Sequence, residues 1–245
     1  MTDSAPATRR VVENYFKTTS ASGSAVDDAA YDASTVGLKR RLGDWLEVRG
    51  QVVLDLGSGT GELCRCAAEA GARSVTGVNL SAEEIEFART KCGANFVQSE
   101  IEAYLRTAPE ASVDRVYALN ILEHLGKDQL VGVLEGVHRV LKPGGTLVVM
   151  VPNATSPFGG MTRYWDFTHE IAFTPSSVRQ LARLVGFKSD VEFRECGPIP
   201  HGLISGVRYL LWQAFRLGIW FRLMVELASS KGGIYTADMM FKLEK

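Results

Sequence analysis

Short apolar runs alternate with stretches of helical periodicity along most of this chain, and this alternation limits the folds open to it. Runs with the length of strands stand at 51–56, 74–78, 95–97, 113–119 and 146–151. Helical stretches follow them, at 61–70, 82–91, 127–141 and 176–185. The pattern predicts βαβ units, and therefore an α/β fold with a mostly parallel sheet and helices on both faces. Continuous valine and leucine are typical of strands that are buried on two sides.

The length and composition indicate one domain with a substantial core. The chain has 245 residues, of which 46% are hydrophobic and 22% are charged, close to ordinary globular usage. Residues 1–35 are rich in serine, alanine and threonine and only weakly apolar, so we expect a flexible N-terminal arm or lid there. We expect a single domain over 36–245, with a long functional loop at 152–175 and an apolar helical insertion at 203–228.

The charge balance and the cysteines exclude several classes of protein. Lysine and arginine number 27 and aspartate and glutamate 28, a net charge of −1, so nucleic acid is disfavoured as the main partner. Cys64, Cys66, Cys92 and Cys196 have no CxxC spacing and no histidine cluster beside them, so we expect no disulfides, no zinc site and no other metal. The first ten residues lack the apolar segment of a signal peptide, and the expected location is the cytoplasm.

A glycine-rich turn follows the first strand, in the segment VVLDLGSGTGEL. Gly57, Gly59 and Gly61 let the backbone turn tightly and approach a ligand, and the next helix offers free N–H groups. The dinucleotide fingerprint needs a third glycine where Glu62 stands, and no Gly-Lys-Ser/Thr follows for a P-loop. An acidic strand end at Asp55 suits a ligand with an amino group or another cationic centre. A purely structural turn is the alternative.

The run VLDLGSGTG resembles motif I of the class I S-adenosylmethionine-dependent methyltransferases, and further segments follow in the order of that family. They are VTGVNLS at 75–81, FVQSEIEAYL at 96–105, VDRVYALNILEHL at 113–125 and RVLKPGGTLVVMVPN at 139–153. The resemblance implies a Rossmann-like seven-stranded sheet in the order 3-2-1-4-5-7-6 with the last strand antiparallel. It also implies S-adenosyl-L-methionine as the cofactor.

By this resemblance, residues near the strand ends hold the cofactor. They are Asp55, Gly57, Ser58, Gly59, Gly61, Asn79, Leu80, Glu100, Ile101, Asn120 and Ile121. The family usually has an acid where this chain has Asn79, facing the ribose hydroxyls. An amide offers one acceptor oxygen in place of a charged carboxylate, so we expect a loss of about 1 kcal/mol for each bond affected.

The methyl acceptor is expected at the loop 152–175, which is rich in aromatic and ionisable side chains. Its DxxH…F(T/S)P pattern resembles a branch of the family from glycan-assembly and secondary-metabolite pathways. His169 is the first candidate for a general base, with Asp166 orienting it or acting alone, and a structural role for His169 is the alternative. His124 of the LEH segment is a further catalytic candidate, although in the family this segment more often shapes the pocket. Candidates for acceptor contact are Tyr15, Phe16, Arg163, Tyr164, Trp165, Phe173 and His201.

The segment 203–227 is unusually apolar, but Arg208, Arg216 and Arg222 interrupt it, so a membrane-crossing helix is not expected. On a helix these arginines fall within about 120° of arc, which leaves a wide apolar face. Four roles stay open: packing on its own domain, covering the acceptor, dimerisation, and peripheral contact with a membrane. The chain is accordingly expected as a monomer or a homodimer.

We therefore predict a methyltransferase that modifies an oxygen of a hydroxylated small molecule or sugar, free or linked to a carrier. Methylation of nitrogen or carbon on a metabolite is an alternative of the same class. A cofactor-binding or assembly protein without catalysis is an alternative of another class, and Asn79 is its main support. A nicotinamide-dependent oxidoreductase is disfavoured by Glu62.

Overall fold

Seven strands form a single sheet in the order β3-β2-β1-β4-β5-β7-β6 in the computed structural model, which describes residues 27–228 and 233–245. The strands are β1 (Val52–Leu56), β2 (Ser74–Asn79), β3 (Asn95–Gln98), β4 (Val113–Leu119), β5 (Leu141–Pro152), β6 (Glu192–Glu195) and β7 (Asp238–Glu244). Neighbours from β3 to β5 are parallel, whereas β7 runs antiparallel to both β5 and β6. The predicted fold class, strand order and reversed last strand are confirmed.

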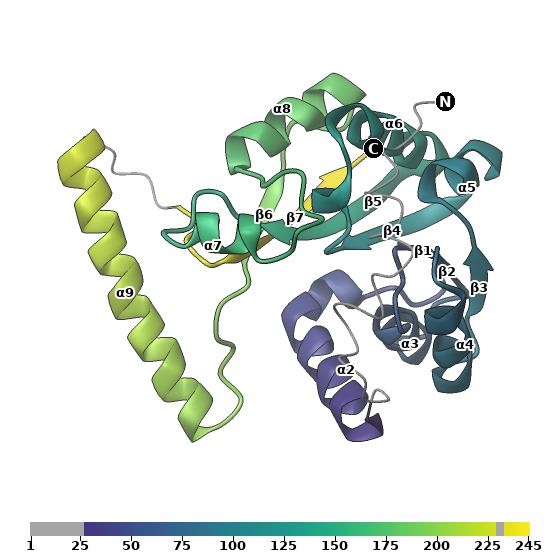
Figure 1. Ribbon diagram of the computed structural model, residues 1–245, viewed down its shortest axis with the longest axis horizontal. Helices are drawn as coiled ribbons and strands as arrows, with labels where there is room; N and C mark the ends of the chain where they lie inside the picture. Colours follow the sequence, from purple (N-terminus) through teal and green to yellow (C-terminus); the bar gives the residue numbers. More distant parts are fainter. Residues whose placement is uncertain (1–26, 229–232) are drawn as a thin grey trace.

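Helices cover both faces of the sheet (Figure 1). One face carries α2 (Asp28–Leu42), η2 (Gly43–Leu46), α3 (Glu62–Glu69) and α4 (Ala82–Lys91). The other carries α5 (Ile101–Thr107), α6 (Lys127–Val140) and α8 (Pro175–Val185). Two short helices, η3 (Leu122–His124) and α7 (Gly159–Tyr164), follow the carboxyl ends of β4 and β5. The parallel strand ends, η3 and α7 therefore share one edge of the sheet.

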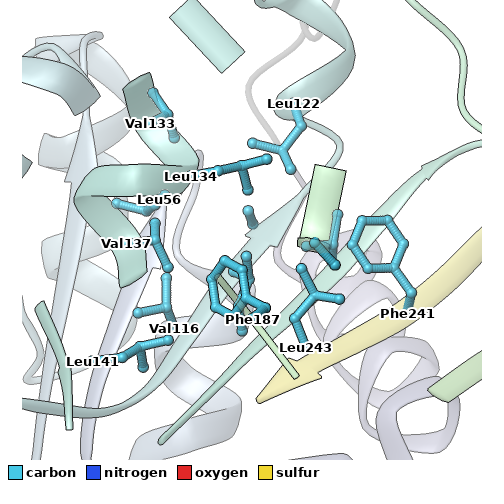
Figure 2. Packing of buried hydrophobic residues seen from close by; sticks show 14 of the residues in the cluster. Leu56, Val116, Leu122, Val133, Leu134, Val137, Leu141, Phe187, Phe241 and Leu243 are labelled. Carbon is cyan, nitrogen blue, oxygen red and sulfur yellow. The ribbon is translucent and has the colours of Figure 1, made fainter. Parts of the chain in front are cut away.

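Alternate residues of the central strands face two separate cores. In β1, Leu54 and Leu56 belong to the larger core under α6 and α8, whereas Val53 belongs to the core formed with α2 and α3. Figure 2 shows part of the larger core, where Leu134 and Val137 of α6 pack over the sheet. Burial on both sides explains why valine and leucine predominate in the central strands. A fully buried leucine or valine contributes about 1.5–3 kcal/mol.

The N-terminal boundary differs from the prediction. The helix α2 begins at Asp28, so residues 28–35 of the expected arm lie in a helix that packs on α3. Asp27 caps this helix by accepting a hydrogen bond from the Ala29 N–H at 3.2 Å, and Tyr31 and Thr35 are buried. The predicted boundary between residues 35 and 36 thus falls inside one helix. Tyr15 and Phe16 lie outside the described residues.

The helix α9 (Leu203–Leu227) stands apart from the sheet in Figure 1. On the inner side, Trp212 Nε1 donates to Glu195 Oε2 at 3.2 Å, and Arg216 pairs with the same carboxylate at 3.2 Å. The outer side exposes a row of large apolar residues: Leu203, Val207, Leu210, Leu217, Phe221 and Val225. The described residues of the domain therefore cover only one side of α9. No helix in the described part of the chain combines the length and apolar character needed to cross a bilayer.

Candidate functional site

The glycine-rich turn connects β1 to α3 at the carboxyl edge of the sheet. Gly57 and Gly59 have φ angles of +72° and +49°, which side chains rarely adopt. The N–H groups of Gly57 and Ser58 donate to the carbonyl of Val78 at 2.9 and 3.1 Å, which holds the turn against β2. A Cβ atom at Gly57 would lie 2.8 Å from the side chain of Ile121, whereas one at Gly59 would meet no atom within 4 Å. The turn therefore has no room for a side chain at Gly57, whereas Gly59 borders open space.

A cavity of about 670 Å³ opens at this turn, and we call it the first cavity. Of the predicted cofactor residues, Asp55, Gly57, Ser58, Gly59 and Asn120 line it. Its wall contains three carboxylates, from Asp55, Glu62 and Glu84, and one arginine, Arg41. The first cavity is therefore an acidic site, which favours a cationic ligand.

Asp55 is the most unusual acid of this wall, because it is 3% exposed. Its Oδ2 accepts a hydrogen bond from the Cys64 thiol at 3.5 Å. Burial raises the pKa of Asp55 to about 7; the thiol bond opposes the rise and the charge of Glu62 adds to it. Beside it, the buried Oγ of Ser58 has no hydrogen-bond partner in the described part of the chain. A buried acid and an unsatisfied hydroxyl gain most from a cationic, hydrogen-bonding ligand.

Asn79 does not line the first cavity, but it positions a residue that does. Its Nδ2 donates to Glu84 Oε2 at 2.7 Å, and Glu84 is in the cavity wall. Burial raises the pKa of Glu84, and the bond from Asn79 opposes that rise. Glu84, in the first turn of α4, thus places a carboxylate in the cavity wall next to the end of β2. Glu84 was not among the predicted cofactor residues, and its place five residues after Asn79 was the missed signal.

The remaining predicted cofactor residues are not in the wall of the first cavity. Glu100 is exposed at the start of α5, and Ile101 packs against the larger core. Leu80 is exposed, and its carbonyl accepts from Gln98 at 3.2 Å. Gly61 lies close to Ala88 and Phe96, and Ile121 supports the turn at Gly57.

The helix α2 supplies wall residues that the sequence analysis missed. They are Ala30, Tyr31, Ser34, Gly37, Leu38 and Arg41. The expectation of a flexible arm over 1–35 accounts for Ala30, Tyr31 and Ser34, although the aspartate at the capping position 27 was a readable start signal.

The LEH segment and the long loop meet at a pair of histidines. The rings of His124 and His169 are in edge-to-face contact, with centroids 4.8 Å apart. The Nδ1 of His169 lies 3.0 Å from the carbonyl of Thr162. Because a carbonyl only accepts, His169 carries its proton on Nδ1, and its Nε2 has a free lone pair for a proton. Burial, and to a lesser degree His169, lower the pKa of His124 to about 4, so His124 is neutral near pH 7.

Asp166 and Glu123 organise the surroundings of this pair. Asp166 Oδ1 accepts from the N–H and the hydroxyl of Thr168 at 2.8 and 2.7 Å, and Thr168 Oγ1 lies 2.7 Å from His124 Nδ1. The carbonyl of Glu123 accepts from the N–H of Glu170 at 2.7 Å, which fastens the loop to η3. The Glu123 side chain is 1% exposed, and burial raises its pKa to about 8. Ligand atoms of Glu123, His124 and His169 lie within 4.8 Å of one another, a grouping that the sequence analysis, which expected no metal, did not foresee.

The predicted acceptor-contact residues lie in different environments. Arg163 donates to the carbonyls of His169 and Glu170, so it holds the loop in shape. Tyr164 and Trp165 are each 79% exposed. Phe173 is 3% exposed and belongs to the larger core, so its prediction as an acceptor contact is corrected to a packing role.

A second cavity, of about 410 Å³, lies next to the first. It is lined by α2, by the segment between β6 and α9, by α9 itself and by the residues before β7. Gly37 and Arg41 line both cavities. Among the predicted acceptor residues, His201 is in its wall. Neither cavity is lined by His124 or His169.

Comparisons with known proteins agree with this fold. The strand order with its reversed seventh strand is that of the Rossmann-like methyltransferase fold. Residues 53–145 match a family model described as a methyltransferase domain.

The similar proteins are distant ones. The O-methyltransferase rstn1 of Aspergillus nomiae is 32% identical over 124 residues, which are 48% of this chain and 54% of that protein. A demethylmenaquinone methyltransferase of Tropheryma whipplei is 37% identical over 102 residues, 41% of each protein. The chain thus spans about half the length, or less, of these curated relatives. A methyltransferase structure from Archaeoglobus fulgidus shares the fold, with a TM-score of 0.65, 21% identity, and coverage of 97% of this chain and 99% of that one.

Proposed function

We propose that the protein transfers a methyl group from S-adenosyl-L-methionine to an oxygen of a hydroxylated small molecule or sugar, free or carrier-linked. The acid-lined first cavity, with its open backbone at Gly59, carries this proposal. Its volume of about 670 Å³ falls in the range of about 300–1,000 Å³ that is typical of small-molecule sites. An ammonium group and a sulfonium centre both suit a wall with three carboxylates.

Four wall residues have a defined task in this proposal. Asp55 and Ser58 receive the ammonium end, Glu84 accepts from the ribose hydroxyls, and Gly59 leaves room for the ligand against the backbone. When bound, the cofactor supplies an activated methyl group on its sulfur. The protein has to hold the acceptor oxygen in line with that group and exclude water.

Calorimetric titration with S-adenosylhomocysteine tests the proposal directly. We expect saturable binding to one site per chain, and no heat at high micromolar concentration would contradict it. Release of S-adenosylhomocysteine in the presence of hydroxylated sugars or phenols tests catalysis separately. Binding without release for any acceptor would favour the alternative of a cofactor-binding protein that serves assembly.

His169 is proposed as the general base, with His124, Thr168 and Asp166 fixing its surroundings. The proton on Nδ1 leaves Nε2 able to accept the proton of a hydroxyl. With the first acceptor identified, we expect His169→Gln to lower kcat by roughly 10²–10⁴-fold with little change in KM. His138→Gln on α6 is the control, because His138 packs against Phe187 away from both cavities. An unchanged kcat in His169→Gln would instead favour transfer to nitrogen or carbon, where no such base is needed.

We also propose that α9 contacts a membrane surface peripherally. Its outer side is a row of exposed apolar residues, as in helices that lie in the interface of a membrane. We expect the chain to co-sediment with phosphatidylglycerol vesicles, and Leu210→Glu combined with Leu217→Glu to abolish this. Val36→Glu, at an exposed apolar residue of α2, is the control. If the chain formed a concentration-dependent dimer and did not bind vesicles, the proposal would be contradicted. The apolar side of α9 would then be an interface with a second copy of the chain.

A cytoplasmic location is part of the same proposal. The four cysteines are free thiols, which fits a reducing compartment.

A further inference from the structure

The two neighbouring cavities have opposite charge. Three carboxylates and one arginine line the first cavity. In the second cavity, Arg40, Arg41 and Arg208 are in the wall, and none of its lining residues is an aspartate or glutamate. A ligand that extends from one cavity to the other therefore passes from acidic to basic surroundings.

The arginines of the second cavity are free to bind an anion. Within the described part of the chain, none of the three forms an ion pair. Two carboxylates lie nearby without facing the cavity. Glu195 is already paired with Arg216 at 3.2 Å, and Asp238 is close enough to Arg41 for that charge to lower its pKa, although burial raises it more. A surplus of positive charge remains, which favours an anion with more than one charge.

A buried hydroxyl supports the same assignment independently. Tyr235 lines the second cavity and is 5% exposed. Its Oη is buried and has no hydrogen-bond partner among the described residues. A buried hydroxyl without a partner is costly, at about 1–3 kcal/mol. Because Tyr235 and the three arginines line the same cavity, its hydroxyl is a candidate donor of a hydrogen bond to an anion bound there.

The second cavity also has an apolar part. Phe158, Pro198, Ile199 and Trp212 line it together with the charged groups. Arg41 marks the junction with the first cavity, where its Nη1 lies 3.6 Å from Met150 Sδ at the end of β5. A molecule whose anionic group binds these arginines can therefore extend past Arg41 into the first cavity.

We propose that the second cavity binds a phosphoryl or diphosphoryl group of the methyl acceptor. This inference rests on the proposed function, since it takes the first cavity as the cofactor site. It narrows the acceptor to a phosphorylated molecule, such as a sugar joined through a diphosphate to a nucleotide or to a prenyl chain. Both sources share the diphosphate, and the second cavity recognises that group.

Calorimetric titration of the full chain with inorganic pyrophosphate tests the proposal, in the presence and absence of S-adenosylhomocysteine. We expect pyrophosphate to bind, and Arg208→Gln to weaken its binding about tenfold or more. Arg222→Gln is the matched control, because it removes the same charge from the same helix at a residue that pairs with Glu226 and does not line the cavity. Tyr235→Phe removes only the hydroxyl and should weaken pyrophosphate binding about fivefold or more.

Uridine diphosphate and farnesyl diphosphate, titrated in parallel, separate the two sources. Tighter binding of one of them than of pyrophosphate, lost in Arg208→Gln, identifies a nucleotide-linked or a prenyl-linked acceptor. No binding of any of the three probes, or equal pyrophosphate binding in Arg208→Gln and Arg222→Gln, overturns the proposal. S-adenosylhomocysteine titrated into each variant confirms folding and reports on the first cavity. A chain that binds pyrophosphate but not S-adenosylhomocysteine would therefore contradict the proposed function and leave the anion site standing.

Discussion

Gly59→Ala is expected to abolish binding of S-adenosylhomocysteine while the chain stays folded. The added Cβ meets no protein atom within 4 Å, so the variant gains only the left-handed backbone strain of about 1–2 kcal/mol. The methyl group stands in the wall of the first cavity, where the ligand has to approach the backbone. Calorimetry measures the binding, and thermal unfolding of the free chain measures the strain.

Gly50→Ala is the matched control for this effect. Gly50 has a φ of +73°, and a Cβ atom there would also meet no atom within 4 Å, but Gly50 does not line the first cavity. Its loss of stability should equal that of Gly59→Ala, and its affinity for S-adenosylhomocysteine should be unchanged. Equal affinity of the two variants for S-adenosylhomocysteine would show that the turn is not part of the cofactor site. Gly57→Ala should be less stable than either, because its Cβ would lie 2.8 Å from Ile121.

Asn79→Asp is expected to weaken cofactor binding, although it introduces the acid that the family usually has at this position. The substitution replaces the donor of the 2.7 Å bond to Glu84 with a second carboxylate. Two carboxylates at that distance cannot both ionise, and one of them retains a proton. We expect affinity for S-adenosylhomocysteine to fall about tenfold or more. Glu84→Gln should cause a similar loss, because it removes the only carboxylate of the pair.

The double variant Asn79→Asp/Glu84→Gln restores one amide and one carboxylate with their positions exchanged. We expect it to bind more tightly than Asn79→Asp alone, which makes the two sites strongly coupled in a double-mutant cycle. Glu83→Gln is the control for the charge change, since Glu83 is exposed on the same turn of α4. Additive losses in the cycle would show that Asn79 and Glu84 act independently, against the role assigned to their hydrogen bond.

Elements with strong local signals were predictable from the sequence. The predicted run over β4 agrees with the structure at both ends, because its apolar residues are bounded by Ser112 and Asn120. Ser81 and Gly186 set the ends of α4 and α8 by side-chain capping and by a left-handed backbone. The start of α2 was missed although Asp27 caps it. Its composition is polar, and the packing of Tyr31 and Thr35 on the rest of the domain does not show in a local pattern.

The candidate site was predictable where it depends on backbone and not where it depends on packing. The turn around Gly57 and Gly59 follows from spacing alone. The contact between His124 and His169 required the loop to fold back on η3, and the sequence analysis named both residues without joining them. Phe173 was assigned to the acceptor because aromatic residues in loops commonly bind rings, but its bridge to Asn153 carries it into the core.

The helix α2 forms part of the wall of both cavities, and this shared wall has a thermodynamic consequence. Gly37 and Arg41 line both cavities, so a ligand in either cavity that orders these residues lowers the entropic cost of binding in the other. Linkage then requires reciprocity: the factor by which the first ligand tightens the second is the factor by which the second tightens the first. Under the proposed function, binding of the cofactor and binding of the anion would therefore be cooperative.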